Sequence, residues 1–186
     1  MTYVTSYNPN IFEISSTVAN NRWENIIEEA ARDFGVPAEL LNQMMRFESS
    51  GNPFAVGDGG MSHGLMQIQQ GTWEDFKKNY GDKLPPDLRN ASYEQIVNDP
   101  EMNMRAAAAM MKAFHDKWMD KGYSSDDAWK LALREYNSGS YAVNPDNLWD
   151  AGPGTPAYVD KIWSAFSTSP NYETNTVPPA DEWDIG

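Results

Sequence analysis

The sequence of 186 residues contains no cysteine and only two histidines, His63 and His115. The absence of cysteine excludes a disulfide framework, a thiolate zinc site and a cysteine nucleophile. Two histidines leave little for a histidine-based metal site, and Asp58 among its glycines lacks the regular ligand spacing of a calcium loop. We therefore expect neither a metal ion nor a cofactor.

Positive charge is also scarce, because 14 Lys and Arg residues stand against 27 Asp and Glu residues, for a formal net charge of −13. Nucleic acids and anionic membranes bind proteins through basic residues, so this balance argues against both partners. No apolar run approaches the roughly 20 residues of a membrane span, which argues against membrane insertion. Residues 1–5 have neither the basic nor the apolar region of an ordinary secretory signal.

Apolar side chains recur at helical spacing along most of the chain, as Trp23, Ile27, Ala30 and Phe34 do in the first such segment. Glycine, proline and capping residues separate these segments, and Ser92 with its partner three residues later forms a capping box. The seven expected helices cover residues 21–34, 37–50, 72–84, 92–98, 99–121, 124–137 and 155–166. The pattern predicts an all-α fold, with a Gly-rich loop over residues 51–64.

Three regions differ in composition. Residues 1–19 carry turn-forming residues, and we interpret them as an extended N-terminal arm. Residues 20–166 form the single helical domain. Residues 167–186 contain four acidic residues, no Lys or Arg and many small polar residues, which is typical of a flexible tail or of one that needs a partner.

Glu48 interrupts the apolar pattern of the second expected helix. It follows Leu41 by seven residues and Met44 by four, so helical spacing places it on their buried face. Burial and the negative end of the helix dipole both disfavour the anion, and both raise the pKa of a carboxyl group. A glutamate at a helix end is ordinarily exposed. Here the Gly-rich loop that follows is typical of a substrate-contacting wall, which favours a general acid instead.

Four motifs extend this hypothesis. Residues 48–55 read ESSGNPFA, residues 64–68 read GLMQI, residues 135–139 read EYNSG and residues 158–159 read YV. In this order, over about residues 28–166, they resemble the signature of soluble lytic transglycosylases. The loop between the first two motifs resembles the form common in bacteriophage and short secreted members.

The resemblance implies a lysozyme-like fold and cleavage of peptidoglycan glycan strands. It implies that Glu48 is the single catalytic acid and base at the bond between N-acetylmuramic acid (MurNAc) and N-acetylglucosamine (GlcNAc), and that the product is 1,6-anhydroMurNAc. The residues that it implies for substrate binding are Ser49, Met66, Gln67, Tyr136, Asn137 and Tyr158. From spacing alone, Met66, Tyr136 and Tyr158 are also ordinary core residues, and Asn137 an ordinary helix end.

Several residues depart from the family pattern or have two interpretations. Related goose-type lysozymes, which hydrolyse the same bond, have an aspartate where this sequence has Gln69, so we favour transglycosylation. Asp58 is the acidic residue of the loop and a candidate to orient water for hydrolysis. We expect Glu135, which replaces a small residue of the motif, to face solvent. We expect the same of His63, whereas His115 on the longest helix is expected to be structural.

Three alternatives remain beside the transglycosylase. They are a hydrolysing muramidase, a structural protein of a phage particle or secretion machine with little turnover, and a carbohydrate-binding module, which a desolvated acid disfavours. The expected place of action is the bacterial cell wall, in the periplasm or outside the cell. Since no export signal is recognised, we expect a lysis enzyme (endolysin) made in a host cytoplasm or a virion-associated enzyme. The tail at 167–186 is the candidate contact with a phage or secretion-machine partner.

Overall fold

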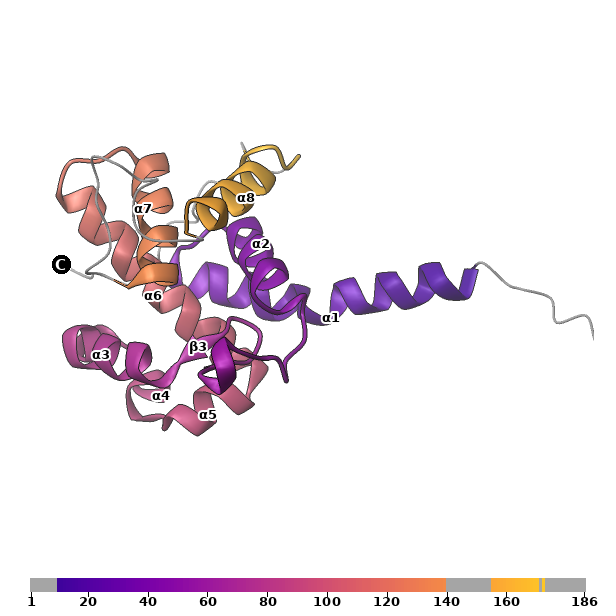
Figure 1. Ribbon diagram of the computed structural model, residues 1–186, viewed down its shortest axis with the longest axis horizontal. Helices are drawn as coiled ribbons and strands as arrows, with labels where there is room; N and C mark the ends of the chain where they lie inside the picture. Colours follow the sequence, from indigo (N-terminus) through magenta and orange to yellow (C-terminus); the bar gives the residue numbers. More distant parts are fainter. Residues whose placement is uncertain (1–9, 140–154, 171, 173–186) are drawn as a thin grey trace, which may run out of the picture.

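The computed structural model describes residues 10–139, 155–170 and 172 (Figure 1). The elements of these ranges are α1 (Asn10–Phe34), α2 (Ala38–Ser49), β1 (Val56–Gly57), β2 (Ser62–His63), β3 (Ile68–Gln69), α3 (Gln70–Tyr80), α4 (Pro86–Asn90), α5 (Tyr93–Asn98), α6 (Pro100–Asp120), α7 (Ser125–Ser138) and α8 (Thr155–Ser167). Short 3-10 turns cover Asp58–Gly60 and Gly81–Lys83. The helical fold class that the sequence predicts is confirmed.

Helix starts follow local capping chemistry where a polar side chain supplies it. Ser92 forms the predicted capping box with Gln95 at the start of α5. The side chain of Asp99 accepts two backbone N–H groups at the start of α6, and that of Ser124 accepts the N–H of Asp127 at the start of α7. These side chains satisfy N–H groups that the first turn of a helix leaves free, and each cap contributes about 1 kcal/mol.

Three expectations about local structure are wrong. Residues 10–19, expected as an extended arm, are helical and form the first part of α1, which projects beyond the rest of the fold (Figure 1). The helix expected from Thr72 begins at Gln70. Pro86, expected only to end that helix, opens the separate short helix α4, where the fixed φ of proline suits the first turn. Residues 1–9 and the tail beyond 172 lie outside the described residues.

The Gly-rich segment contains a small antiparallel sheet in the order β1-β2-β3, which the sequence analysis did not predict. Val56 pairs with His63, and Ser62 pairs with Gln69. Because side chains alternate across a sheet, Ser62 and Gln69 share one face, while Val56 and His63 lie on the other. Ser62 and Gln69 both border the pocket described below.

Helix α6 organises the core. It packs mainly against α7 and α1, and also against α5. Figure 1 shows α2, α7 and α8 toward one side of the molecule and α3, α4, α5 and the sheet toward the other, with α6 between them. Small residues at positions 106–109 of α6 are all buried, which allows close helix packing. The core therefore holds the two sides of the molecule at fixed positions.

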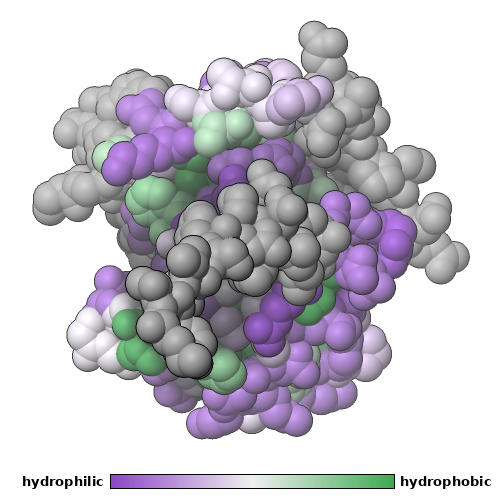
Figure 2. Space-filling model, turned by 90° about the vertical axis from the view of Figure 1, so that its right-hand side faces the viewer, coloured by the Kyte–Doolittle hydropathy of each residue, from purple (hydrophilic) through white to green (hydrophobic). Residues whose placement is uncertain are grey.

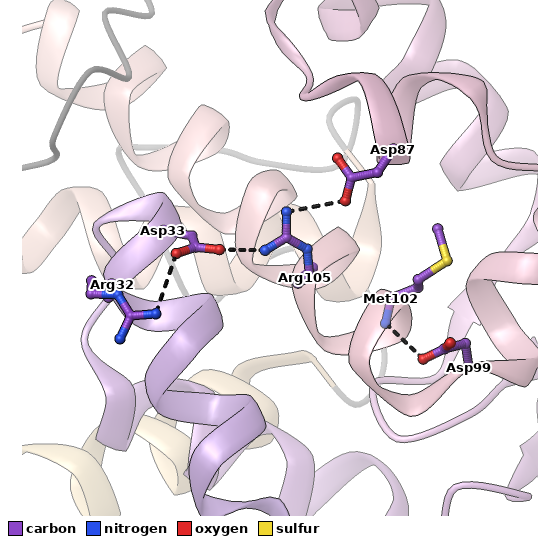
Figure 3. Close-up of polar contacts among 6 residues, drawn as sticks. All are labelled: Arg32, Asp33, Asp87, Asp99, Met102 and Arg105. Carbon is purple, nitrogen blue, oxygen red and sulfur yellow. Dashed lines mark hydrogen bonds and ion pairs between the residues drawn. The ribbon is translucent and has the colours of Figure 1, made fainter.

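Polar contacts at one end of α6 connect three helices (Figure 3). Arg105 pairs with Asp33 of α1, and its other terminal nitrogen lies 3.1 Å from the carboxylate of Asp87 in α4. Arg32 lies beside Asp33, at 3.7 Å. The guanidinium of Arg105 also lies over the ring of Phe34. Because guanidinium donors fork, one arginine bonds both carboxylates and ties α4 to the long helices.

The surface viewed from the side on which α1 projects is mostly hydrophilic where it is coloured, and hydrophobic atoms form separate patches (Figure 2). None of the helices in the described ranges combines the length and the apolar character that crossing a bilayer requires.

Candidate active site

Glu48 lies in the last turn of α2, where its position follows from the packing of that helix. Leu41 and Met44 have no exposed surface, and burial of each contributes about 1.5–3 kcal/mol. Their burial turns Glu48 inward, so that it is half-buried. Burial raises the pKa of Glu48 from 4.5 to about 7; a hydrogen bond from Tyr158 lowers it, and the nearby charge of Asp58 raises it. The predicted desolvated carboxyl group is therefore confirmed.

Tyr158 reaches Glu48 from α8, which packs against α2. Its hydroxyl donates a hydrogen bond of 2.7 Å to Oε1 of Glu48. The side chain is 2% exposed, and the ring of Phe47 packs edge-on against it at 5.1 Å. Burial and then the charge of Glu48 raise the pKa of Tyr158 well above its usual value, so the phenol is a donor near neutral pH. The hydroxyl lies where the motif predicts, whereas a contact with substrate stays a prediction.

Tyr136 approaches from α7 and contacts the GLMQI segment. Its hydroxyl donates to the backbone oxygen of Met66 at 2.7 Å, and burial raises its pKa well above the usual value. The side chain of Met66 has no exposed surface. Met66 therefore packs in the core and offers no side-chain surface for a sugar, contrary to the prediction, while its backbone oxygen positions Tyr136.

Gln67 has a left-handed backbone, with φ of 50°. Its Nε2 donates to the backbone oxygens of Ala55 at 3.0 Å and Gly64 at 2.9 Å. A Cβ at Gly57 would lie 2.4 Å from Oε1 of Gln67, so only glycine allows this approach. The amide nitrogen is thus held by the backbone, and Oε1 is the atom left for the predicted contact with substrate.

Ser49 ends α2 instead of facing the pocket. Its hydroxyl donates to the backbone oxygen of Met45, and the Gly51 N–H donates to Ser49 Oγ. Ser50 then has φ of 53°, and its N–H bonds back to Arg46 as a helix C-cap. These contacts fix the helix end that carries Glu48.

A pocket of about 210 Å³ opens beside Glu48. It is lined by Glu48, Asp58, Ser62, Gln67, Ile68, Gln69, Thr72, Met110, Tyr136, Asn137, Ser138 and Gly139. The structure thus brings four predicted residues to one cavity: Glu48, Gln67, Tyr136 and Asn137. Tyr158, Ser49 and Met66 do not line the cavity, although Tyr158 bonds to Glu48.

Sequence reasoning overlooked Ser62 and Gln69 as pocket residues. Ser62 Oγ and Gln69 Nε2 lie 3.1 Å apart, and both bond to Asp58. The signal that could have found them is alternation: Ser62 and Gln69 lie on the same face of the hairpin once the strand pairing is known.

His63, expected in solvent, is half-buried and contacts Tyr93 of α5. Tyr93 donates its hydroxyl proton to the backbone oxygen of Ile68 at 2.8 Å. Nδ1 of His63 lies 3.0 Å from the same hydroxyl oxygen and is therefore the donor of that bond. The pair ties the hairpin to α5.

Glu135 is also not in solvent, since it is 1% exposed. Its two carboxylate oxygens lie 2.8 and 2.9 Å from Lys117 Nζ, and Trp118 Nε1 donates at 3.0 Å. The partners lie on α6, so the motif residue Glu135 joins two core helices. His115 is structural as expected, with its ring stacked on Trp129 at 3.9 Å between centroids.

Across residues 10–139, 155–170 and 172, the acidic and histidine side chains form no group of three or more that could hold a metal ion. The chemistry that the arrangement supports is proton transfer by one carboxyl group with a pKa of about 7.

The sequence matches a known protein family over most of its length. Residues 25–150 match the model of the Transglycosylase SLT domain. The chain belongs to this family. The match includes Glu48, Gln67 and Tyr136, and ends before Tyr158.

Two relatives illustrate the range of this SLT family. Membrane-bound lytic murein transglycosylase C of Histophilus somni (strain 2336) is 29% identical over 149 residues, which are 76% of this chain and 39% of the relative. Invasion protein IagB of Salmonella typhimurium (strain SL1344) is 27% identical over 150 residues, which are 79% of this chain and 78% of the relative. The chain thus spans well under half of the first relative and most of the second.

Proposed function

We propose that the protein is a peptidoglycan lytic transglycosylase that cleaves the β-1,4 bond between MurNAc and GlcNAc and leaves a 1,6-anhydroMurNAc end. The observation that carries this proposal is Glu48, a half-buried carboxyl group with a pKa of about 7 at the wall of a polar pocket. Membership of the SLT family supports the same reaction.

Glu48 acts twice in this mechanism. Its proton passes to the glycosidic oxygen as the bond to C1 of MurNAc breaks, and GlcNAc leaves with the new hydroxyl. The resulting carboxylate then takes the proton of the MurNAc 6-hydroxyl, whose oxygen bonds to C1. The acid is regenerated and no water is consumed. One carboxyl group suffices for these transfers because the substrate supplies the nucleophile.

The pocket residues have matching tasks in the proposal. Tyr158 donates to the carboxylate form of Glu48 between the two transfers, through the hydroxyl that already lies 2.7 Å away. Oε1 of Gln67 accepts from a sugar hydroxyl or amide, and Asn137 offers a donor and an acceptor at the rim. Tyr136 keeps the backbone of the GLMQI segment in place.

The setting of the reaction is proposed from the substrate. Peptidoglycan lies in the bacterial cell wall, and one relative is named a lytic murein transglycosylase. A second relative is named an invasion protein. The bacteriophage setting, the endolysin role and a partner for residues 167–186 rest on sequence alone, and most of this tail lies outside the described residues.

Incubation with purified sacculi tests the proposal. Mass analysis of soluble muropeptides should detect 1,6-anhydroMurNAc ends with the native protein and none with Glu48→Gln. Glu28→Gln, at an exposed position of α1, is the control for an equal change of charge. Reducing MurNAc ends would assign hydrolysis instead, and no release by the native protein would contradict an enzymatic role.

A further inference from the structure

Asp58 lies in the turn between β1 and β2, and it lines the same pocket as Glu48. Its Oδ2 accepts a hydrogen bond of 2.5 Å from Ser62 Oγ and one of 3.0 Å from Gln69 Nε2. Both donors belong to the face of the hairpin that borders the pocket. Asp58 is exposed, and the two donors orient its carboxylate at the pocket wall.

The backbone at Asp58 is strained, with φ of 49°. Among the described residues, the only other non-glycine residues with positive φ are Ser50 and Gln67. Ser50 caps the helix of Glu48, and Gln67 lines its pocket. Glycine would adopt this conformation at Asp58 without strain, and strained residues cluster at functional sites. The side chain at position 58 therefore has a task that glycine cannot perform.

Two groups act on the pKa of Glu48, namely Tyr158 from α8 and Asp58 from the hairpin. Glu48 in turn raises the pKa of Tyr136 on α7. Within the described ranges, no Lys, Arg or His lies within ion-pair distance of Glu48 or Asp58. Among the described residues that line the pocket are the acidic side chains of Glu48 and Asp58 and no Lys, Arg or His.

We propose that Asp58 supplies fixed negative charge that stabilises the positive, oxocarbenium-like sugar formed as the glycosidic bond breaks. The proposal rests on the function proposed above, and it assigns this pocket a second carboxylate. Glu48 transfers the protons, whereas Asp58 acts through its charge and forms no bond to the sugar. A preorganised charge of this kind is effective because it needs no reorientation during the reaction. The same charge favours retention of the proton on Glu48.

Asp58→Asn removes the charge and keeps an oxygen that can accept from Ser62 and Gln69. We expect turnover on sacculi to fall by about tenfold to a hundredfold. The alkaline limb of the pH profile should move to lower pH, because loss of a neighbouring anion lowers the pKa of Glu48. Asp120→Asn, at the exposed end of α6, makes the same change of net charge and should change neither quantity.

Binding of a charged ligand provides a test that needs no turnover. A cationic iminosugar of N-acetylhexosamine shape carries the charge of the proposed intermediate, and chitotetraose is its neutral counterpart. Calorimetry should show at least tenfold weaker iminosugar binding to Asp58→Asn than to the native protein, with chitotetraose binding unchanged. Ser62→Ala, which keeps the charge and removes one of the two donors, should give a smaller loss.

Equal turnover, an unmoved alkaline limb and equal iminosugar affinity in Asp58→Asn would overturn the proposal and leave Asp58 as a hairpin residue. Equal losses for iminosugar and chitotetraose would also overturn it, because shape rather than charge would then be responsible. Failure of the transglycosylase proposal would appear differently, as absence of anhydro products from the native protein.

Discussion

Glu48 and Glu135 both lie near the C-terminal ends of their helices, but their surroundings give the same type of side chain different roles. Glu48 on α2 is half-buried against the hydroxyl of Tyr158. Glu135 on α7 is fully buried against the ammonium of Lys117 and the indole N–H of Trp118. The hydroxyl of Tyr158 is a neutral partner for Glu48, whereas Glu135 forms an ion pair with Lys117 and accepts from the indole of Trp118. Burial raises the pKa of Glu48, which has no cation at ion-pair distance among the described residues, whereas burial beside Lys117 gives Glu135 an ion pair.

The largest expected effect is the loss of activity in Glu48→Gln. Removal of the proton donor should lower turnover on sacculi by about 10²–10⁴-fold. The fold should remain intact, because the amide fits the same space without a buried ionisable group. Release of soluble muropeptides measures the first effect and thermal unfolding the second. Residual activity above a tenth of the native value would contradict the role of Glu48.

The next effect concerns the other glutamate. Glu135→Gln leaves Lys117 without this carboxylate and should lower the free energy of unfolding by about 2 kcal/mol, because Lys117 is partly exposed and keeps part of its hydration. Denaturant unfolding measures this loss, and turnover per folded molecule should be retained at temperatures well below unfolding. In the double variant with Lys117→Met, part of the loss should be recovered because position 117 no longer carries a charge that has lost its carboxylate. A strong loss of turnover with unchanged stability in Glu135→Gln would contradict the structural role of Glu135.

Stability should depend on pH through Glu48. Its folded pKa of about 7 exceeds the ordinary 4.5, so the folded protein binds more protons than the unfolded chain between these values. The free energy of unfolding therefore decreases as pH rises from about 4.5 to 7, by up to about 3 kcal/mol from this group. Glu48→Gln cannot titrate, so its stability relative to the native protein should increase between pH 5 and 8. Parallel stability curves for the two proteins would contradict the raised pKa.

The features that could be predicted from the sequence are those that depend on residues close together along the chain. The burial of Glu48 follows from Leu41 and Met44 on the same helix, and the caps at Ser92 and Asp99 follow from local chemistry. The approach of Tyr158 came from the order of the family motifs, since no local rule connects α8 with α2.

The features that were not predicted depend on residues far apart in the sequence, or on sequence patterns too short to recognise. Glu135 was expected in solvent because Lys117 lies on another helix, 18 residues earlier. The strands have two residues each, too few to show an alternating pattern. The turn-forming residues of 10–19 each cost less than about 0.7 kcal/mol in a helix, which continuation of α1 overcomes.

The smallest expected effect is that of Tyr158→Phe, which removes the hydroxyl and keeps the ring. Tyr158→Phe removes the hydrogen bond that lowers the pKa of Glu48, so this pKa should rise further. Activity needs the protonated acid, and the alkaline limb of the pH profile should therefore move to higher pH, with a loss of about 1 kcal/mol in stability. Tyr136→Phe is the matched control, because its hydroxyl bonds to the Met66 backbone and should affect stability without moving the limb as far. A shift of the alkaline limb to lower pH in Tyr158→Phe would mean that the hydroxyl of Tyr158 stabilises the protonated form of Glu48. The comparison with Glu135 would then rest only on the ion pair that Glu135 forms with Lys117.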